Sequence, residues 1–223
     1  MFMRAWRGLI LAALAILGGS LRAEAVDWGG LHWSWNAPEG GRYEVLPGAK
    51  LSLKAPFGSR LAPFRRESAL LFTRTVPDND FNLRTRVRIA GEDRVSGSAY
   101  GLILWNGAVD RGKAQWIAFG PENRGEGTLS VRGCWKGGAD GKKVLLKLPY
   151  SRPGVSLQVL RRDRNTYVFS FAPEAGDGWV EAGRLSCPVV FDRVGFFVES
   201  DQDEATLVFS EFDWRIAVGS QGE

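Results

Sequence analysis

The chain has 223 residues, of which 44% are hydrophobic and 24% charged, and its formal net charge is +4. Because 29 Lys and Arg nearly balance 25 Asp and Glu, the charge gives no argument for nucleic acid as a partner, and we expect none. The single histidine and two cysteines exclude histidine-rich metal chemistry and a zinc site built from cysteine alone. We therefore predict no cofactor.

The first 25 residues, MFMRAWRGLILAALAILGGSLRAEA, have the three parts of a secretory signal peptide. Arg4 and Arg7 form the positive beginning, residues 9–17 form the apolar centre, and residues 23–25 form a small-x-small cleavage site. The apolar run is short for a membrane span, and an uncleaved anchor is the alternative. No cysteine follows the run, so we do not expect a lipid-anchored N-terminus.

We therefore predict a secreted or periplasmic protein whose mature chain, Val26 to Glu223, forms one domain and has no membrane span. The leader removes three arginines and one glutamate, which lowers the net charge from +4 to +2. A chain of this length is enough for one sizeable core, and an all-β sandwich of this size is usually a single domain. The sequence shows no internal repeat, long linker or second-domain boundary.

The two cysteines, Cys134 and Cys187, leave two alternatives open. In an oxidising compartment they can form a disulfide, which would stabilise the fold by roughly 4 kcal/mol in the chain-entropy model. Two unpaired buried thiols are equally compatible with the sequence, because spacing along the chain does not show whether the side chains meet.

Alternation of apolar and polar residues dominates the mature chain and is typical of strands. In LHWSWN, 31–36, the two tryptophans share a face with Leu31, and in FNLRTRVRI, 81–89, every second residue is an arginine or asparagine. The segment 155–171 is predicted to be a hairpin that turns near Asp163, and 207–216 a last strand. About a dozen such strands, separated by turn signals such as LPGA and VPDND, predict an antiparallel sandwich.

A further hairpin is predicted from residues 100–106 and 115–121, with Trp105 directly opposite Trp116. That register places Leu102, Leu104, Ile117 and Phe119 together on one face, which we expect to point into the core. The other face carries both tryptophans beside glycines and alanines, so that large rings adjoin empty space. We expect this face to be concave and to form an aromatic groove, with a second packed layer as the alternative. A register shift of one residue would separate the two rings.

Four segments occur in an order that resembles one branch of the concanavalin A-like lectin/glucanase superfamily. They are DFNLRTRVRI, YGLILWNG with AQWIAFG, VSLQVLRRDRNTYVFSF with DGW, and VGFFVES with ATLVFSEFDW. The branch consists of bacterial domains of unknown function related to the C-terminal β-sandwich of family 43 β-xylosidases. The resemblance covers about Gly30 to Ile216 and implies a two-sheet jelly roll with one sheet curved into a concave face. Such domains often have a serine before the Asp-Gly, but FAPEAGDGW has Ala172 and extra residues, so we expect a remodelled loop.

The sequence gives little support for catalysis. His32 lies at the polar phase of a predicted strand, and no serine has the surroundings of a nucleophile elbow. Glucanases of the resembled superfamily carry E-x-D-x-x-E on one strand, and ESDQDE places Glu199, Asp201 and Glu204 at those offsets. Polar residues fill the intervening positions, so we interpret this segment as an acidic turn. Glu211 and Asp213 share a strand face but lack a third carboxylate.

Two charged groups have alternative interpretations. The turn containing Asp201, Asp203 and Glu204 has oxygen ligands suited to calcium, but a plain solvated turn is the preferred interpretation. The alternating row Arg84, Arg86 and Arg88 is suited to polyanionic sugars, but it is also the ordinary solvent side of a strand, which we prefer.

The predicted function is non-catalytic carbohydrate binding at an aromatic concave face, with a poly- or oligosaccharide as partner. The alternatives are a glycoside hydrolase with an atypical carboxylate pair and a structural or protein-binding domain of the cell envelope. We expect Trp33, Trp35 and Trp214 to be core residues. The candidate ligand-binding residues are aromatic rings with neighbouring polar groups: Trp105, Trp116, Asn106, Gln115, Gln158, Arg161, Trp135 and Trp179.

Overall fold

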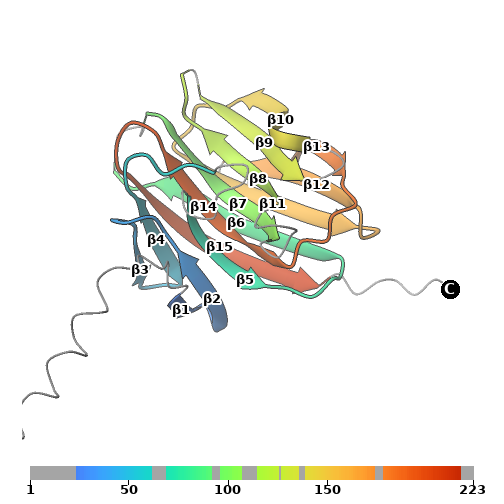
Figure 1. Cartoon of the computed structure of the whole chain (residues 1–223), viewed down its shortest axis with the longest axis horizontal. Coiled ribbons are helices and arrows are strands. Elements are labelled where there is room, and N and C mark those ends of the chain that lie inside the picture. The colour runs from blue at the N-terminus through green and yellow to red at the C-terminus, as the bar shows by residue number, and fades with distance from the viewer. Residues whose placement is uncertain are drawn as a thin grey trace, which may run out of the picture.

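The computed structural model describes residues 24–61, 69–91, 96–106, 115–125, 127–135, 139–173 and 178–216. In these ranges all regular structure is β, and the strands form two antiparallel sheets packed face to face (Figure 1). The predicted two-sheet jelly-roll sandwich is therefore confirmed. The described residues contain no helix long and apolar enough to cross a membrane. The predicted leader lies outside them, apart from its last two residues.

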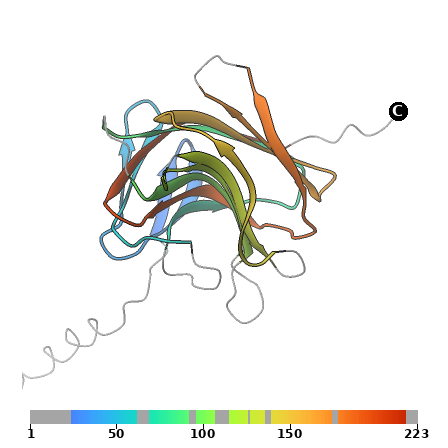
Figure 2. The same cartoon turned by 90° about the horizontal axis from the view of Figure 1, so that it is seen from above.

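The larger sheet has eight strands, and its middle is formed by strands distant in sequence. Figure 2 shows the two curved layers edge-on. The strands follow in spatial order: β1 (Glu24–Trp28), β2 (Leu31–Asn36), β5 (Leu70–Thr75), β14 (Arg193–Ser200), β7 (Ser98–Asn106), β8 (Gln115–Glu122), β9 (Thr128–Trp135) and β10 (Ala139–Pro149).

The smaller sheet has seven strands, and β6 (Phe81–Ile89), which carries the alternating arginines, lies at its centre. The early strands β1 to β4 gather at one end of the molecule, whereas β9, β10, β12 and β13 lie at the other (Figure 1). The spatial order is β13 (Val180–Ser186), β12 (Thr166–Ala172), β11 (Gly154–Arg162), β6 (Phe81–Ile89), β15 (Ala205–Ile216), β4 (Lys50–Ala55) and β3 (Arg42–Leu46).

The core between the sheets follows from the alternation of apolar residues. Along β2, Trp33 and Trp35 are buried while their neighbours are more exposed, as the pattern predicts. Trp33 stacks on both Phe72 and Phe196, with ring centroids 5.0 and 5.5 Å away. Such stacked and edge-on aromatic pairs stabilise the core beyond the area that they bury.

The hairpin of β11 and β12 turns where the sequence predicts. In the three-residue turn between Arg162 and Thr166, Asp163 and Arg164 have φ angles of 51° and 58°, in the left-handed region that tight turns use. The side chain of Asp80 accepts hydrogen bonds from both backbone N–H groups, at 3.0 and 2.9 Å. A carboxylate from another part of the chain therefore fixes this turn.

The predicted register of β7 with β8 is also confirmed. Trp105 pairs with Trp116, and Leu102 and Leu104 pair with Phe119 and Ile117. These four aliphatic and aromatic side chains belong to the core between the sheets.

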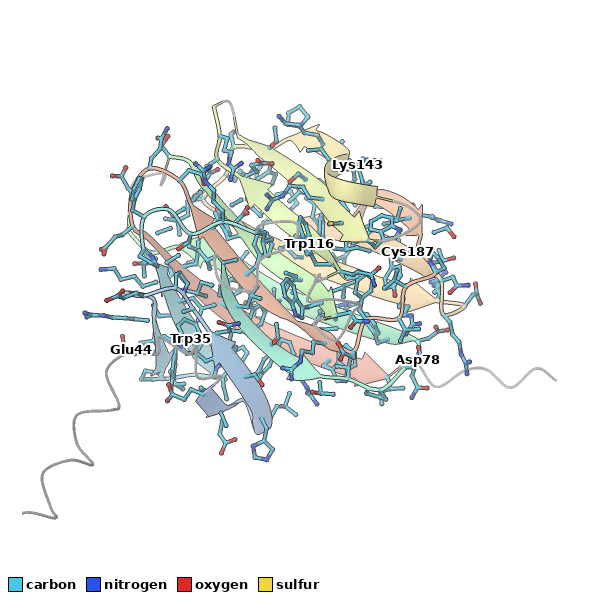
Figure 3. The ribbon with its side chains drawn as sticks, in the orientation of Figure 1. Trp35, Glu44, Asp78, Trp116, Lys143 and Cys187 are labelled. Atoms are coloured by element: carbon cyan, nitrogen blue, oxygen red, sulfur yellow. The ribbon has the colours of Figure 1, made fainter. Side chains whose placement is uncertain are left out.

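The two cysteines form no disulfide and lie in separate apolar clusters. Cys187 belongs to the core region between the sheets, whereas Cys134 lies on the opposite face of the larger sheet. Figure 3 shows Cys187 well to one side of Trp116, which shares a cluster with Cys134. Burial raises the pKa of the Cys187 thiol and so favours its neutral form. Of the two alternatives, the structure contains two separate buried thiols rather than a disulfide.

Close approach of backbones in the larger sheet requires glycine at Gly195. A Cβ atom at this position would lie 2.1 Å from the carbonyl oxygen of Phe72 and 2.7 Å from the Cα of Thr73, both on the neighbouring strand. Backbone atoms cannot move aside as a flexible side chain does, so a methyl group here forces β5 and β14 apart.

We therefore predict that Gly195→Ala destabilises the fold by about 1–3 kcal/mol or more, because overpacking strains the sheet. The measurement is urea unfolding followed by tryptophan fluorescence. Gly178→Ala is the matched control, because a Cβ at Gly178 meets no atom within 4 Å. Equal stabilities of the two variants would contradict the close approach.

Candidate functional site

The predicted aromatic face is the outer face of the larger sheet, which points away from the smaller sheet. Trp105 and Trp116 lie there together, in one apolar cluster with Ile103, Ala118 and Phe197. However, Trp105 is only 6% exposed and Trp116 is 0% exposed. The expectation of open space beside the two rings is therefore wrong, because neither ring leaves a face open to solvent or to a ligand.

The same face carries a buried ion pair between Glu199 and Arg132. Glu199 is the last residue but one of β14, and its side chain is 0% exposed. Arg132 of β9 is 2% exposed and places Nη1 2.6 Å from Glu199 Oε2. The guanidinium group also lies 5.5 Å from the ring centre of Phe197. The interpretation of Glu199 as part of an acidic turn is therefore wrong, since its backbone belongs to the middle of the sheet.

We call this group, with its neighbours Glu122, Arg124 and Asp201, the acid–arginine network. Arg124 lies within salt-bridge distance of all three carboxylates, at 3.5 Å from Glu122, 3.7 Å from Glu199 and 2.8 Å from Asp201. Its side chain is 34% exposed, so the network reaches solvent at this arginine. Positive and negative groups alternate in it, which offsets the cost of removing the charges from water.

The segment that ends at Leu61 packs over Glu199. Ser59 bridges to Ser200 at the end of β14, and the backbone N–H of Leu61 donates to Glu199 Oε1 at 2.5 Å. Leu61 is itself buried in the outer apolar cluster. The Glu199 carboxylate is thus held most closely by Arg132 and by the backbone N–H of Leu61, and it is shielded from solvent.

The hydrolase alternative requires two carboxylates beside the aromatic face. Glu122 and Glu199 lie on the same face of the larger sheet as Trp105 and Trp116. Glu199 aligns with Ala99, and Ala99 with Glu122, in one row across three strands. A glycosidase needs two carboxylates that reach the glycosidic bond. Glu199 is instead fully buried against Arg132, and we conclude that it holds this face together rather than meeting a substrate.

Two further acidic residues of the ESDQDE segment form ion pairs with residues earlier in the chain. Asp201 pairs with Arg60 at 2.6 Å, and Glu204 pairs with Lys54 at 2.5 Å. In the part of the chain that the structure describes, no group of three His, Cys, Asp or Glu side chains is placed to hold a metal ion. His32, the single histidine, is 91% exposed and contacts Asp27.

Two of the predicted ligand-binding residues, Trp135 and Arg161, are buried elsewhere in the fold. Trp135 is 5% exposed and belongs to the core between the sheets, so it does not line a rim. Arg161 is 1% exposed, pairs with Asp78 at 2.7 Å and donates to the carbonyl oxygens of Arg164 and Asn79. The expectation of Trp135 and Arg161 as accessible ligand-binding groups is therefore wrong.

The amide residues of the predicted set are divided between the sheets. Asn106 and Gln115 pair with each other next to the buried tryptophans, and Asn106 donates to the carbonyl oxygen of Val190 at 2.9 Å. Gln158 lies on β11 of the smaller sheet, and Trp179 precedes β13 of that sheet. The structure therefore does not bring the eight candidates into one site.

The outer face of the smaller sheet carries an exposed aromatic group, which we call the Trp179 platform: Trp179, Arg84, Gln158 and Asn82. Trp179 is 40% exposed, and the guanidinium carbon of Arg84 lies 5.2 Å from its ring centre. Gln158 pairs with Arg84 in register, and with its amide oxygen toward the guanidinium it accepts from Nε and Nη2 at 3.1 and 3.0 Å. Asn82 contacts the same amide. The arginine is thus fixed on one side and supports the ring on the other.

The sequence contains a signal for part of this platform. Alternation places Asn82 and Arg84 on the solvent side of β6, and the structure confirms this outer face. The contact between Arg84 and Trp179 joins residues 95 positions apart in the sequence, and Glu199 and Arg132 are 67 positions apart. Neither pairing has a local motif that identifies it.

Comparison with known proteins places the fold but not the activity. No protein-family model and no curated protein matches the sequence. A functionally unknown protein from Saccharomyces cerevisiae is similar in structure, with a TM-score of 0.64 and 18% identity over 84% of this chain and 97% of that one.

Two structures with named roles are also similar. The GH43 protein BlXynB from Bacillus licheniformis has a TM-score of 0.63 and 15% identity, and the match covers 83% of this chain but 36% of that one. The carbohydrate-binding module CBM66 from Bacillus subtilis has a TM-score of 0.50 and 11% identity, over 82% of this chain and 94% of the module. The chain thus has the concanavalin A-like sandwich fold that the sequence predicts, and it corresponds to about a third of the GH43 chain.

We predict that Glu199→Gln lowers the free energy of unfolding by about 3–5 kcal/mol, because it leaves the buried Arg132 charge uncompensated. Thermal or urea unfolding measures this loss. Glu204→Gln is the control: it breaks a partly exposed pair with Lys54, for which we expect a change below about 1 kcal/mol. A Glu199 variant as stable as this control would contradict the structural role.

We also predict that Trp116→Ala destabilises the protein by about 3–5 kcal/mol, the range for a fully buried large aromatic residue. Truncation leaves a cavity among Trp105, Cys134 and the neighbouring aliphatic side chains. Trp179→Ala, at a half-exposed ring, serves as the comparison in the same unfolding experiment. Equal losses for the two variants would show that Trp116 is not a core residue.

Proposed function

We propose that this chain is a secreted or periplasmic carbohydrate-binding sandwich that acts without catalysis and binds a poly- or oligosaccharide at the Trp179 platform. The observation that carries the proposal is a 40% exposed indole ring held by an arginine. Sugar rings pack their C–H faces on exposed aromatic rings, while adjacent polar side chains supply hydrogen bonds. Arg84 and Asn82 are the neighbouring polar groups.

The geometry favours Trp179 over the tryptophan pair of the larger sheet. A ring that is 0% exposed, as Trp116 is, offers no face to a ligand, whereas Trp179 needs no rearrangement. The interaction with Arg84 also restricts the motion of the indole before a ligand arrives, which lowers the entropy lost on binding. The similarity of the fold to a carbohydrate-binding module and to GH43 proteins supports a sugar as the ligand class.

A protein-binding role is the second candidate, favoured by apolar side chains at one edge of the sandwich. Val144 of β10 and Val180 of β13 are 57% and 50% exposed. The two edge strands approach each other there, since Leu146 lies 3.1 Å from the Cβ position of Gly183. Exposed apolar residues at strand edges are suited to contact with another protein.

Export remains part of the proposal and has a direct test. Glu24 and Ala25 are exposed in β1, and Val26 is the first buried side chain of that strand. Cleavage after Ala25 therefore leaves the apolar contacts of the strand in the mature chain. We predict that N-terminal sequencing of the protein from a secreting host begins at Val26. Recovery of Met1 in a membrane fraction would contradict this prediction.

We predict that Trp179→Ala weakens saccharide binding by about 5- to 150-fold, which corresponds to roughly 1–3 kcal/mol, the scale of a base stacked on an aromatic ring. Affinity electrophoresis against a panel of soluble polysaccharides, followed by calorimetry on the best ligand, measures the change. The matched control is Phe57→Ala, which removes a 68% exposed aromatic ring elsewhere and should leave binding unaltered.

Two results would argue against the proposed function. Unchanged affinity of Trp179→Ala would remove the platform as the binding site. Release of reducing ends from the bound polysaccharide by the unmodified protein would instead support the hydrolase alternative.

A further inference from the structure

The arginine row of β6 leads from the Trp179 platform to a hollow at one end of the smaller sheet. This hollow has a volume of about 630 Å³ and is lined by Arg86, Arg88, Arg152, Gly154, Ile89 and Pro173, among others. We call it the arginine groove. We infer that it binds the carboxylate or sulfate group of an acidic saccharide, an inference that rests on the proposed saccharide binding and gives it a ligand class.

Strand geometry brings the three arginines together. Arg86 and Arg88 are two residues apart on β6, so their side chains leave the same face of the sheet. Gly154, the first residue of β11, pairs with Arg88. That pairing places the preceding Arg152 at the same end. Guanidinium groups bind carboxylate and sulfate-like oxygens through paired, charge-assisted hydrogen bonds, so this set is suited to an anion.

The groove stays open because of the residue between the arginines. A Cβ atom on Gly154 would lie 3.4 Å from Cβ of Arg88 and 3.5 Å from the carbonyl oxygen of Val87. A larger residue at this position would therefore crowd the start of the Arg88 side chain. The preceding loop is fixed as well, since Tyr150 donates from its hydroxyl to the carbonyl oxygen of Gly154 at 2.5 Å.

Glu211 is a carboxylate that competes with a ligand anion for Arg86. Glu211 lies 3.8 Å from Arg86 Nη1, and its side chain is 63% exposed. An exposed ion pair at this separation contributes little to stability, so a ligand anion can take the place of Glu211. Arg88 is exposed on the same strand. A ligand anion can therefore reach Arg86 and Arg88 from solvent.

An adjoining hollow supplies the apolar surface that a sugar ring needs. It has a volume of about 440 Å³, shares Arg152 and Pro173 with the arginine groove, and is lined further by Tyr150 and Phe171. The two aromatic rings meet edge-on with centroids 6.0 Å apart. Charged and aromatic walls thus meet at Arg152, which suits a sugar ring bearing an acidic substituent.

The groove and the platform are positioned for one ligand chain. Arg84 of the platform and Arg88 of the groove are four residues apart on β6, or roughly 13 Å at the usual rise of a strand. An extended oligosaccharide that stacks on Trp179 can follow the arginine row to the groove. Stacking on Trp179 provides the affinity for neutral sugars. A negative charge on the sugar adds further affinity at the arginine groove.

The test compares two polymers that differ only in charge. Binding of the mature chain is measured by calorimetry against polygalacturonate and against the same polymer after chemical reduction of its carboxyl groups. The variant is Arg88→Gln with Arg152→Gln, and its matched control is Arg42→Gln with Lys50→Gln. The control removes two positive charges from exposed positions on the edge strand β3 and its neighbour β4.

We expect the unmodified protein to prefer polygalacturonate, and we expect this preference to weaken as salt is raised. The Arg88/Arg152 variant should lose affinity for polygalacturonate by at least about tenfold, since it removes two charge-assisted contacts to the ligand. Its affinity for the reduced polymer should stay unchanged. The Arg42/Lys50 control should bind both polymers as the unmodified protein does.

The outcomes separate this inference from the proposed function. Equal affinity for the two polymers, or equal losses in variant and control, overturns the arginine groove while saccharide binding stands. Binding of polygalacturonate that depends on Arg88 and Arg152 but not on Trp179 upholds the groove and overturns the platform. Failure of the unmodified protein to bind either polymer overturns the groove, and failure against the wider polysaccharide panel overturns the proposed function.

Discussion

Register at the centre of the larger sheet is the constraint on which the rest of the structure depends. β7 lies between β14 and β8, and its pairings set which residues of all three strands face the core. A shift of one residue would turn every side chain of a strand to the other face. The backbone contact at Gly195 holds β14 close to β5 in a single alignment. The placement of Leu102 in the core and of Trp105 outside it follows from this register.

The same register explains the buried ion pair on the outer face. Glu199 and Phe197 alternate with core residues of β14, and Arg132 alternates with core residues of β9. Both strands therefore turn a charged side chain toward a face that is otherwise apolar. Removing these charges from water is costly, and the cost is offset only because the two groups meet at 2.6 Å. The pair thus ties the middle of the sheet to β9 at one defined geometry.

The two outer faces of the sandwich consequently differ in what they offer a ligand. The outer face of the larger sheet is closed by a buried apolar cluster and by the acid–arginine network. The outer face of the smaller sheet is polar along β6 and carries a half-exposed tryptophan beside it. Aromatic residues alone do not define a sugar-binding face, because a tryptophan in a sandwich is as well suited to a packed layer. Exposure, together with a fixed polar neighbour, distinguishes Trp179.

Alternation along the chain by itself determined the fold class, most strand positions, the β11–β12 turn and the pairing of Trp105 with Trp116. These properties depend on local periodicity and turn chemistry, which short segments contain in full. Only the tertiary structure decided that the tryptophan pair is buried, that Glu199 lies in a strand beside Arg132, and that Trp179 stands on Arg84. Each of these facts depends on residues far apart in sequence, and side-chain burial depends on what packs above a face, which periodicity along one strand cannot specify.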